Sequence, residues 1–144
     1  MATEEDLLYN RKVTVTRILD GDTVDTVVDL GFGILAQPSG RFKLGQFRLY
    51  GIDAPETSFR RPGLTEEQWS VEKAAGLKAK ARVEELLLGK TVYVQSKKPD
   101  KYGRWLGLFW MNVADVGVLQ KSVNWQLLMV EAIVRAYEDE PLKA

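Results

Sequence analysis

The feature that most constrains the fold is one long helical segment between Thr65 and Gly89, because short strand-like segments lie on both sides of it. Thr65 and Gln68 have the spacing of a capping box, and Leu64 can pack on Trp69 as a hydrophobic staple. Gly89 is typical of a helix C-terminal stop. Between these ends, apolar residues at helical spacing predict a core-facing stripe made of Val71, Ala75, Ala79, Val83 and Leu86.

Strand patterns precede this helix. Alternating β-branched residues predict a hairpin over residues 12–30 that turns at residues 20–22, and a further strand over residues 46–52. Glycine, proline and serine in residues 31–45 predict a loop or an irregular ribbon between the hairpin and that strand.

Two more strands and a second helix follow. Residues 91–95 and 105–111 have strand character, and a basic hairpin loop over residues 97–104 joins them. A second helix is predicted from Leu119 to about Tyr137. Its apolar stripe consists of Leu119, Val123, Leu127, Val130 and Val134.

The order of these elements favours an α+β fold over a doubly wound sheet, in which strands and helices alternate throughout. Five short strands with a helix after the third predict a five-stranded OB-fold β-barrel with two or three flanking helices. The 144 residues, 45% of them hydrophobic, suffice for one compact core. We therefore predict one domain over residues 12–138, an N-terminal extension over residues 1–11 and a C-terminal tail over residues 139–144.

Composition excludes several classes of chemistry. The absence of cysteine and histidine excludes disulfides, thiolate nucleophiles, histidine acid–base catalysis and zinc sites with imidazole ligands. The 20 basic and 20 acidic residues cancel, so a nucleic acid would have to bind through local charge.

The acidic start lacks the pattern of an export signal, and no stretch approaches the ~20 apolar residues of a membrane span. We therefore expect a cytoplasmic protein without a membrane partner.

The residues suited to chemistry fall into three short clusters, over residues 20–23, 48–56 and 101–104. Acidic residues at turns and strand ends can meet at a common point, and their oxygens suit a hard cation such as Ca²⁺. Arginine binds phosphate through two hydrogen bonds and keeps its charge. Together they predict a phosphodiester site built from Asp22, Arg48, Asp53, Glu56 and Arg104.

Each cluster alone has an ordinary structural explanation. Asp-Gly-Asp is a common turn, and an arginine in a strand is most often solvated or ion-paired. An acidic residue followed by proline can simply end a strand, and lysine-rich hairpin tips are usually solvated. The combination of all three clusters in one short chain favours the functional interpretation.

The clusters, in this order and at these separations, resemble the signature of the staphylococcal nuclease family over residues 12–135. The resemblance implies an OB barrel and Ca²⁺-dependent hydrolysis of DNA, RNA or both, with little sequence specificity and 3′-phosphate products. The implied residues are Asp22, Asp53 and the carbonyl of Ala54 for the metal, Arg48, Glu56 and Arg104 for catalysis, and Lys101, Tyr102 and Tyr137 for substrate.

Two single residues are among the departures from the family pattern. Ala54 replaces the threonine of the best-known relative, but only its main-chain oxygen is needed. Glu131 stands where the family usually has a glycine that ends the second helix.

The alternative function is a catalytically inactive OB-fold module that binds nucleic acid or protein, but the complete set of acids and arginines favours the enzyme. For the enzyme we expect a single-stranded DNA or RNA substrate and a monomer, with a homodimer left open.

Overall fold

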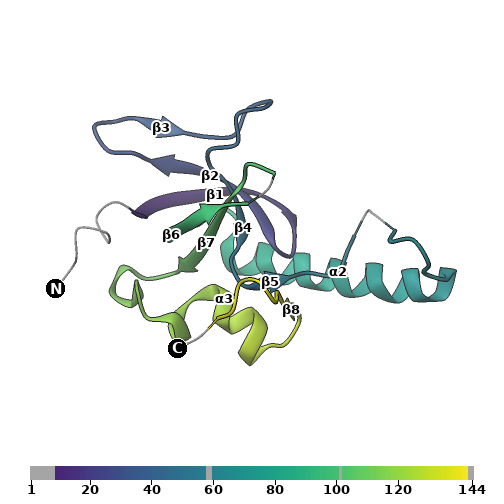
Figure 1. Ribbon diagram of the computed structural model, residues 1–144. Helices are drawn as coiled ribbons and strands as arrows, with labels where there is room; N and C mark the ends of the chain where they lie inside the picture. The colour runs from purple at the N-terminus through teal and green to yellow at the C-terminus, as the bar shows by residue number, and fades with distance from the viewer. Residues whose placement is uncertain (1–8, 58–59, 101, 143–144) are drawn as a thin grey trace.

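The computed structural model describes residues 9–57, 60–100 and 102–142, and its centre is a closed five-stranded barrel (Figure 1). The barrel strands are β1 (Asn10–Asp20), β2 (Thr23–Asp29), β4 (Gln46–Leu49), β6 (Thr91–Pro99) and β7 (Trp105–Trp110). The strands follow the order β1, β6, β7, β4, β2, and the barrel closes because β2 also pairs with β1. The β4–β7 pairing is parallel and the other barrel pairings are antiparallel. The predicted α+β class with an OB-type barrel is confirmed.

The turn between β1 and β2 packs tightly against the rest of the domain. A Cβ atom at Gly21 would lie 2.8 Å from the Cβ atoms of both Ala54 and Ala79. Contacts this short exclude a side chain, so the turn needs glycine for close approach to the long helix and to the chain segment after β4. This packing places Asp22, the next residue, beside Ala54.

Residues 31–45 form an irregular ribbon, one of the two predicted alternatives, whereas two predicted strands have other bounds in the structure. Residues 31–45 contain a short strand, β3 (Leu35–Ala36), which pairs with the end of β2 and forms a ribbon. β6 continues to Pro99 instead of ending at residue 95, so the hairpin loop before β7 spans only residues 100–104. The predicted strand over residues 46–52 is interrupted after β4, and its last part forms β5 (Ile52–Asp53), which pairs with β8 (Arg135–Ala136).

The long helix α2 (Glu66–Leu87) forms as predicted, and its capping box between Thr65 and Gln68 is present. The predicted stripe is wrong at its N-terminal end: Val71 is 68% exposed and Ala75 is also exposed. Figure 1 gives the reason, since one end of α2 projects beyond the barrel. The buried residues of the helix are Gly76, Ala79, Val83 and Leu87.

The second helix is shorter than predicted. The segment after β7 passes through two 3-10 turns, η1 (Val113–Asp115) and η2 (Leu119–Lys121), then α3 (Val123–Trp125), and ends as the π-helix η3 (Gln126–Val130). Two residues later Ala132 adopts a left-handed conformation with φ 53°. This residue takes the chain out of the helix without glycine and leads it into β8.

The prediction of a helix to Tyr137 was therefore wrong. The predicted stripe fails where the helix ends: Val130 is 71% exposed, and Val134 is buried only because the chain turns back toward β5. Within the part of the chain that the structure describes, no helix is long and apolar enough to cross a membrane.

Candidate active site

A cleft of about 570 Å³ opens where the β1–β2 turn, the end of β4 and the β6–β7 hairpin meet. Three sequence clusters that are far apart along the chain thus line one cavity. Lys101 lies outside the described residues. The other predicted site residues all line the cleft, and these are Asp22, Arg48, Asp53, Ala54, Glu56, Tyr102, Arg104 and Tyr137.

Asp22 is held by the backbone of the segment after β5. The main-chain N–H of Ala54 donates to Asp22 Oδ2 at 3.0 Å, and the Thr23 hydroxyl donates to Oδ1 at 2.9 Å. Burial raises the pKa of Asp22 to about 7, and a hydrogen bond and repulsion from Asp20 add to the shift. The carboxyl group is therefore fixed in position by hydrogen bonds, and within residues 9–57, 60–100 and 102–142 it forms no ion pair.

Glu56 and Asp53 extend the acidic group. Burial raises the pKa of Glu56, and the negative charges of Asp22 and Asp53 raise it further. The position of Glu56 depends on Gly76, because a Cβ atom there would lie 2.7 Å from the Glu56 carbonyl oxygen. The helix α2 can therefore press directly against this segment, which is a role for Gly76 that sequence reasoning did not assign.

The donor set fits a hard cation. Several acidic side chains line the cleft, and burial together with repulsion between the acids raises the pKa values of Asp22 and Glu56, which a cation would offset. Among residues 9–57, 60–100 and 102–142, no three acidic side chains form an ion site by themselves. A cation here would therefore need main-chain or water oxygens in addition to carboxylates.

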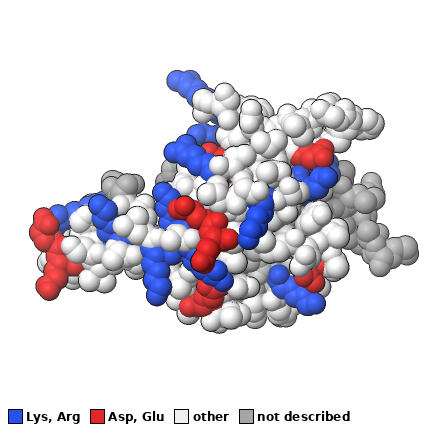
Figure 2. Space-filling view, turned by 180° about the vertical axis from the view of Figure 1, so that it is seen from behind, with Lys and Arg blue, Asp and Glu red and all other residues white. Residues whose placement is uncertain are grey.

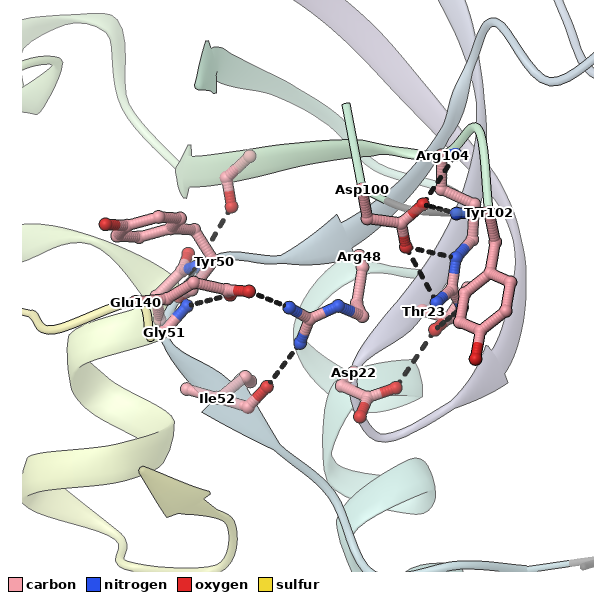
Figure 3. A network of polar contacts seen from close by, with 12 residues as sticks. Asp22, Thr23, Arg48, Tyr50, Gly51, Ile52, Asp100, Tyr102, Arg104 and Glu140 are labelled. Carbon is pink, nitrogen blue, oxygen red and sulfur yellow. Dashed lines mark hydrogen bonds and ion pairs between the residues drawn. The ribbon is translucent and has the colours of Figure 1, made fainter. Parts of the chain in front are cut away.

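Arg48 lies on β4 and is almost completely buried, with 10% of its side chain exposed. Its Nη1 donates to the Ile52 carbonyl at 2.9 Å, and its Nη2 forms an ion pair with Glu140 (Figure 3). Glu140 in turn accepts a hydrogen bond from the Gly51 N–H at 3.0 Å. The Arg48 guanidinium also lies 4.7 Å from the ring centre of Tyr137.

Glu140 is a site residue that the sequence interpretation missed, since residues 139–144 were predicted to be a tail. It is 5% exposed although it follows the last strand by four residues. A buried arginine requires an acidic partner, and this requirement was the one indication in the sequence that an acid should pair with Arg48. It did not distinguish Glu140 from other acids in the same segment.

Arg104 is held locally. Its Nε and Nη2 both contact Asp100 Oδ2 at 2.8 Å, and its Nη1 donates to the Thr23 hydroxyl at 3.3 Å. Asp100 Oδ1 accepts the main-chain N–H groups of Tyr102 and Arg104, each at 2.9 Å, and so fixes the hairpin loop. In Figure 3 this group lies on one side of Asp22, and the Arg48 group lies on the other.

The profile of the family described as "Staphylococcal nuclease homologue" matches residues 46–139. The chain is 30% identical to "Micrococcal nuclease" of Shigella flexneri over 117 residues, which are 81% of this chain and 52% of that protein. It is 33% identical to "Protein ParB" of Escherichia coli over 99 residues, which are 69% of this chain and 41% of that protein.

The chain thus spans about half the length, or less, of the curated relatives it matches. The profile match covers β4, the acidic segment after it, α2, the β6–β7 hairpin and β8. These elements carry both arginines and most of the cleft. On this match and on the barrel topology, the chain belongs to the staphylococcal nuclease homologue family.

Proposed function

We propose that this chain hydrolyses phosphodiester bonds of DNA or RNA in a Ca²⁺-dependent reaction, with little sequence specificity and with 3′-phosphate products. The observation that carries the proposal is the single cleft that gathers carboxylates, one glutamate of raised pKa and two arginines. Similarity to a protein named Micrococcal nuclease supports the same reaction class. Contacts of this kind act on the phosphate and not on base edges, so weak sequence preference follows.

Asp22, Asp53 and the main-chain oxygen of Ala54 are the groups that would hold Ca²⁺. When bound there, the ion would polarise the phosphate and reduce the repulsion between the acids. The hydrogen bond from the Ala54 N–H to Asp22 fixes the orientation of the Asp22 carboxylate. The protein therefore holds this ligand in place before a cation arrives.

Glu56 is proposed to accept the proton of the attacking water. Its raised pKa brings it closer to neutral pH than an ordinary glutamate, and this strengthens it as a base. Because Asp22 and Asp53 contribute to that shift, the metal ligands and the base form one electrostatic unit.

The arginines are proposed to stabilise negative charge on the phosphate in the transition state. A guanidinium carries more N–H groups than the partners of Arg48 or Arg104 use, so each can bind phosphate without losing its acid. Their acids hold both guanidiniums at fixed positions in the wall of the cleft. Groups placed in advance need little reorganisation during the reaction, which makes their charge effective.

Charge is also distributed unevenly over the surface, despite the net charge of zero. The face in Figure 2 shows acidic side chains gathered near its centre, with lysine and arginine side chains around them. Such an arrangement lets a polyanion approach through local positive charge while the acids remain available for a cation.

The test is cleavage of single-stranded DNA and of RNA with Ca²⁺ and with a chelator in its place. We expect cleavage only with the cation, and loss of cleavage in Asp22→Asn. Lys121→Gln changes an exposed charge on η2 and is the matched control. Binding of both nucleic acids without cleavage at any Ca²⁺ concentration would instead support the inactive binding module.

A further inference from the structure

A second cleft, of about 470 Å³, adjoins the active-site cleft at the end of β6. Lys98 and Pro99 line both cavities, so the two clefts share a wall. The remaining lining residues of the second cleft are Tyr9, Gln95, Ser96, Lys97 and Trp105. None of these residues has a role in the function proposed above.

The lining of the second cleft combines two aromatic rings with two lysines. Tyr9 is 40% exposed, and Trp105 is partly buried against the barrel core. Lys97 and Lys98 are both exposed, and the Lys97 ammonium lies 6.0 Å from the ring centre of Tyr50. Aromatic faces bind unpaired bases by stacking, and lysines bind the backbone phosphates between them.

The aromatic residues come from two different parts of the chain, the residue just before β1 and the start of β7. The Ser96 hydroxyl donates to the Tyr9 carbonyl at 3.3 Å, which ties the residue just before β1 to β6. Trp105 begins β7 and lies opposite Pro99 in the strand pairing. The extension of β6 to Pro99, beyond the predicted strand, therefore carries the second cleft up to the edge of the active site.

We propose that the second cleft is a nucleotide subsite that holds an unpaired base of the substrate strand beyond the two nucleotides that flank the cleaved phosphodiester. This inference rests on the proposed function, because it assigns a place to the strand that the active site cleaves. Tyr9 and Trp105 stack with the base, Lys97 binds a phosphate, and Lys98 contacts the backbone where it passes from one cleft to the other. A base in a duplex cannot expose its face in this way, so the subsite selects single strands.

The test compares a dinucleotide, which fills only the active site, with a single-stranded oligonucleotide of about twelve nucleotides, a length within the usual range for an OB fold. The measured quantity is kcat/KM for the oligonucleotide divided by kcat/KM for the dinucleotide. Loss of one stacked base predicts that this ratio falls about tenfold in Tyr9→Ala. Trp105→Leu should show the same fall and keeps apolar bulk at the core, while Trp105→Phe keeps a ring and should retain most of the ratio.

Phe32→Ala is the matched control, because Phe32 is fully exposed on the β2–β3 ribbon and outside both clefts. It should leave the ratio at the parental value. A proportional loss on both substrates in Tyr9→Ala, or an unchanged ratio in both Tyr9→Ala and Trp105→Leu, would overturn the subsite.

A separate measurement distinguishes failure of the subsite from failure of the proposed function. Fluorescence anisotropy of a labelled oligonucleotide, in chelator, reports binding without cleavage. If the parent protein cleaves neither substrate, the proposed function fails, and weaker binding by Tyr9→Ala than by Phe32→Ala still supports the subsite. Equal binding by the two variants overturns the subsite. Preference for a duplex over the same single strand would also overturn it.

Discussion

The two arginines of the cleft are held in opposite ways. Arg104 takes its acidic partner from four residues earlier in the same hairpin, whereas Arg48 pairs with Glu140, which is 92 residues away. The Arg104 side chain is 22% exposed and that of Arg48 is 10% exposed. One half of the site is therefore a local loop structure, and the other half depends on the C-terminal segment reaching the barrel.

Because of this difference, loss of one member of the ion pair should lower the stability of the protein by different amounts in the two halves of the site. A local pair can rearrange within its loop when one member is lost, but a buried pair between distant segments leaves an uncompensated charge in the interior. Substitutions in the Arg48 half should therefore lower both the catalytic rate and the stability of the fold. Substitutions in the Arg104 half should lower the catalytic rate alone.

The largest expected effect belongs to Glu56, which lines the same cleft as both arginines and serves as a reference for the chemical step. Glu56→Gln keeps the shape of the side chain but removes the base, so kcat should fall by about 10² to 10⁴-fold. Single-turnover cleavage measures this loss, and calcium titration should still show binding, because Asp22 and Asp53 remain as the proposed side-chain ligands. A kcat close to the parental value would assign proton transfer to another group.

Replacing each arginine by lysine tests the comparison directly. Lysine keeps the charge but loses the planar two-pronged geometry, so kcat should fall by about 10²-fold or more in both Arg48→Lys and Arg104→Lys. Urea unfolding should separate them, with a clear loss of stability in Arg48→Lys and little change in Arg104→Lys. Equal stability of the two variants would break the distinction between a buried and a local pair.

The partners of the arginines provide the next test. Glu140→Gln leaves Arg48 without a counter-charge but keeps an acceptor for Gly51, so the free energy of unfolding should fall by about 2 kcal/mol. Asp100→Asn should cost about 1 kcal/mol or less, because the loop of residues 100–104 can rearrange without opening the barrel. Glu138→Gln, an exposed change in the same segment as Glu140, is the control. A larger loss in Asp100→Asn than in Glu140→Gln would reverse the proposed roles.

The same contrast explains what could be predicted from the sequence. The barrel, the long helix with its Thr65 cap and the placement of three clusters around one cleft follow from local patterns, turn residues and family resemblance. The Asp100–Arg104 pair was not predicted, although its two residues lie only four positions apart in the predicted hairpin loop.

The features that escaped prediction depend on contacts between distant segments. The second helix ends because Ala132 takes a left-handed conformation that its side chain does not favour, and no residue type marks that turn. The pairing of β8 with β5 then directs the chain so that Glu140 reaches Arg48. The exposed N-terminal half of α2 likewise reflects the size of the barrel and not the helical pattern itself.

The smallest expected effect concerns Asp22. It tests whether the two arginines of the cleft remain paired with Glu140 and Asp100. Burial raises the pKa of Asp22 to about 7 and Asp20 adds to the shift, while the ion pairs of Arg48 and Arg104 are with Glu140 and Asp100. The proposed Ca²⁺ ligand is the carboxylate form of Asp22, so affinity should be lost as the pH falls through about 7. The dissociation constant should be about tenfold higher at pH 6 than at pH 8, because most Asp22 side chains are protonated at the lower pH. Isothermal titration at both pH values measures the change, and Asp22→Asn should bind weakly at both. If an arginine turned from its own acid to Asp22, the pKa would fall toward its usual range and the two dissociation constants would agree, which would contradict the separate pairing of Arg48 and Arg104.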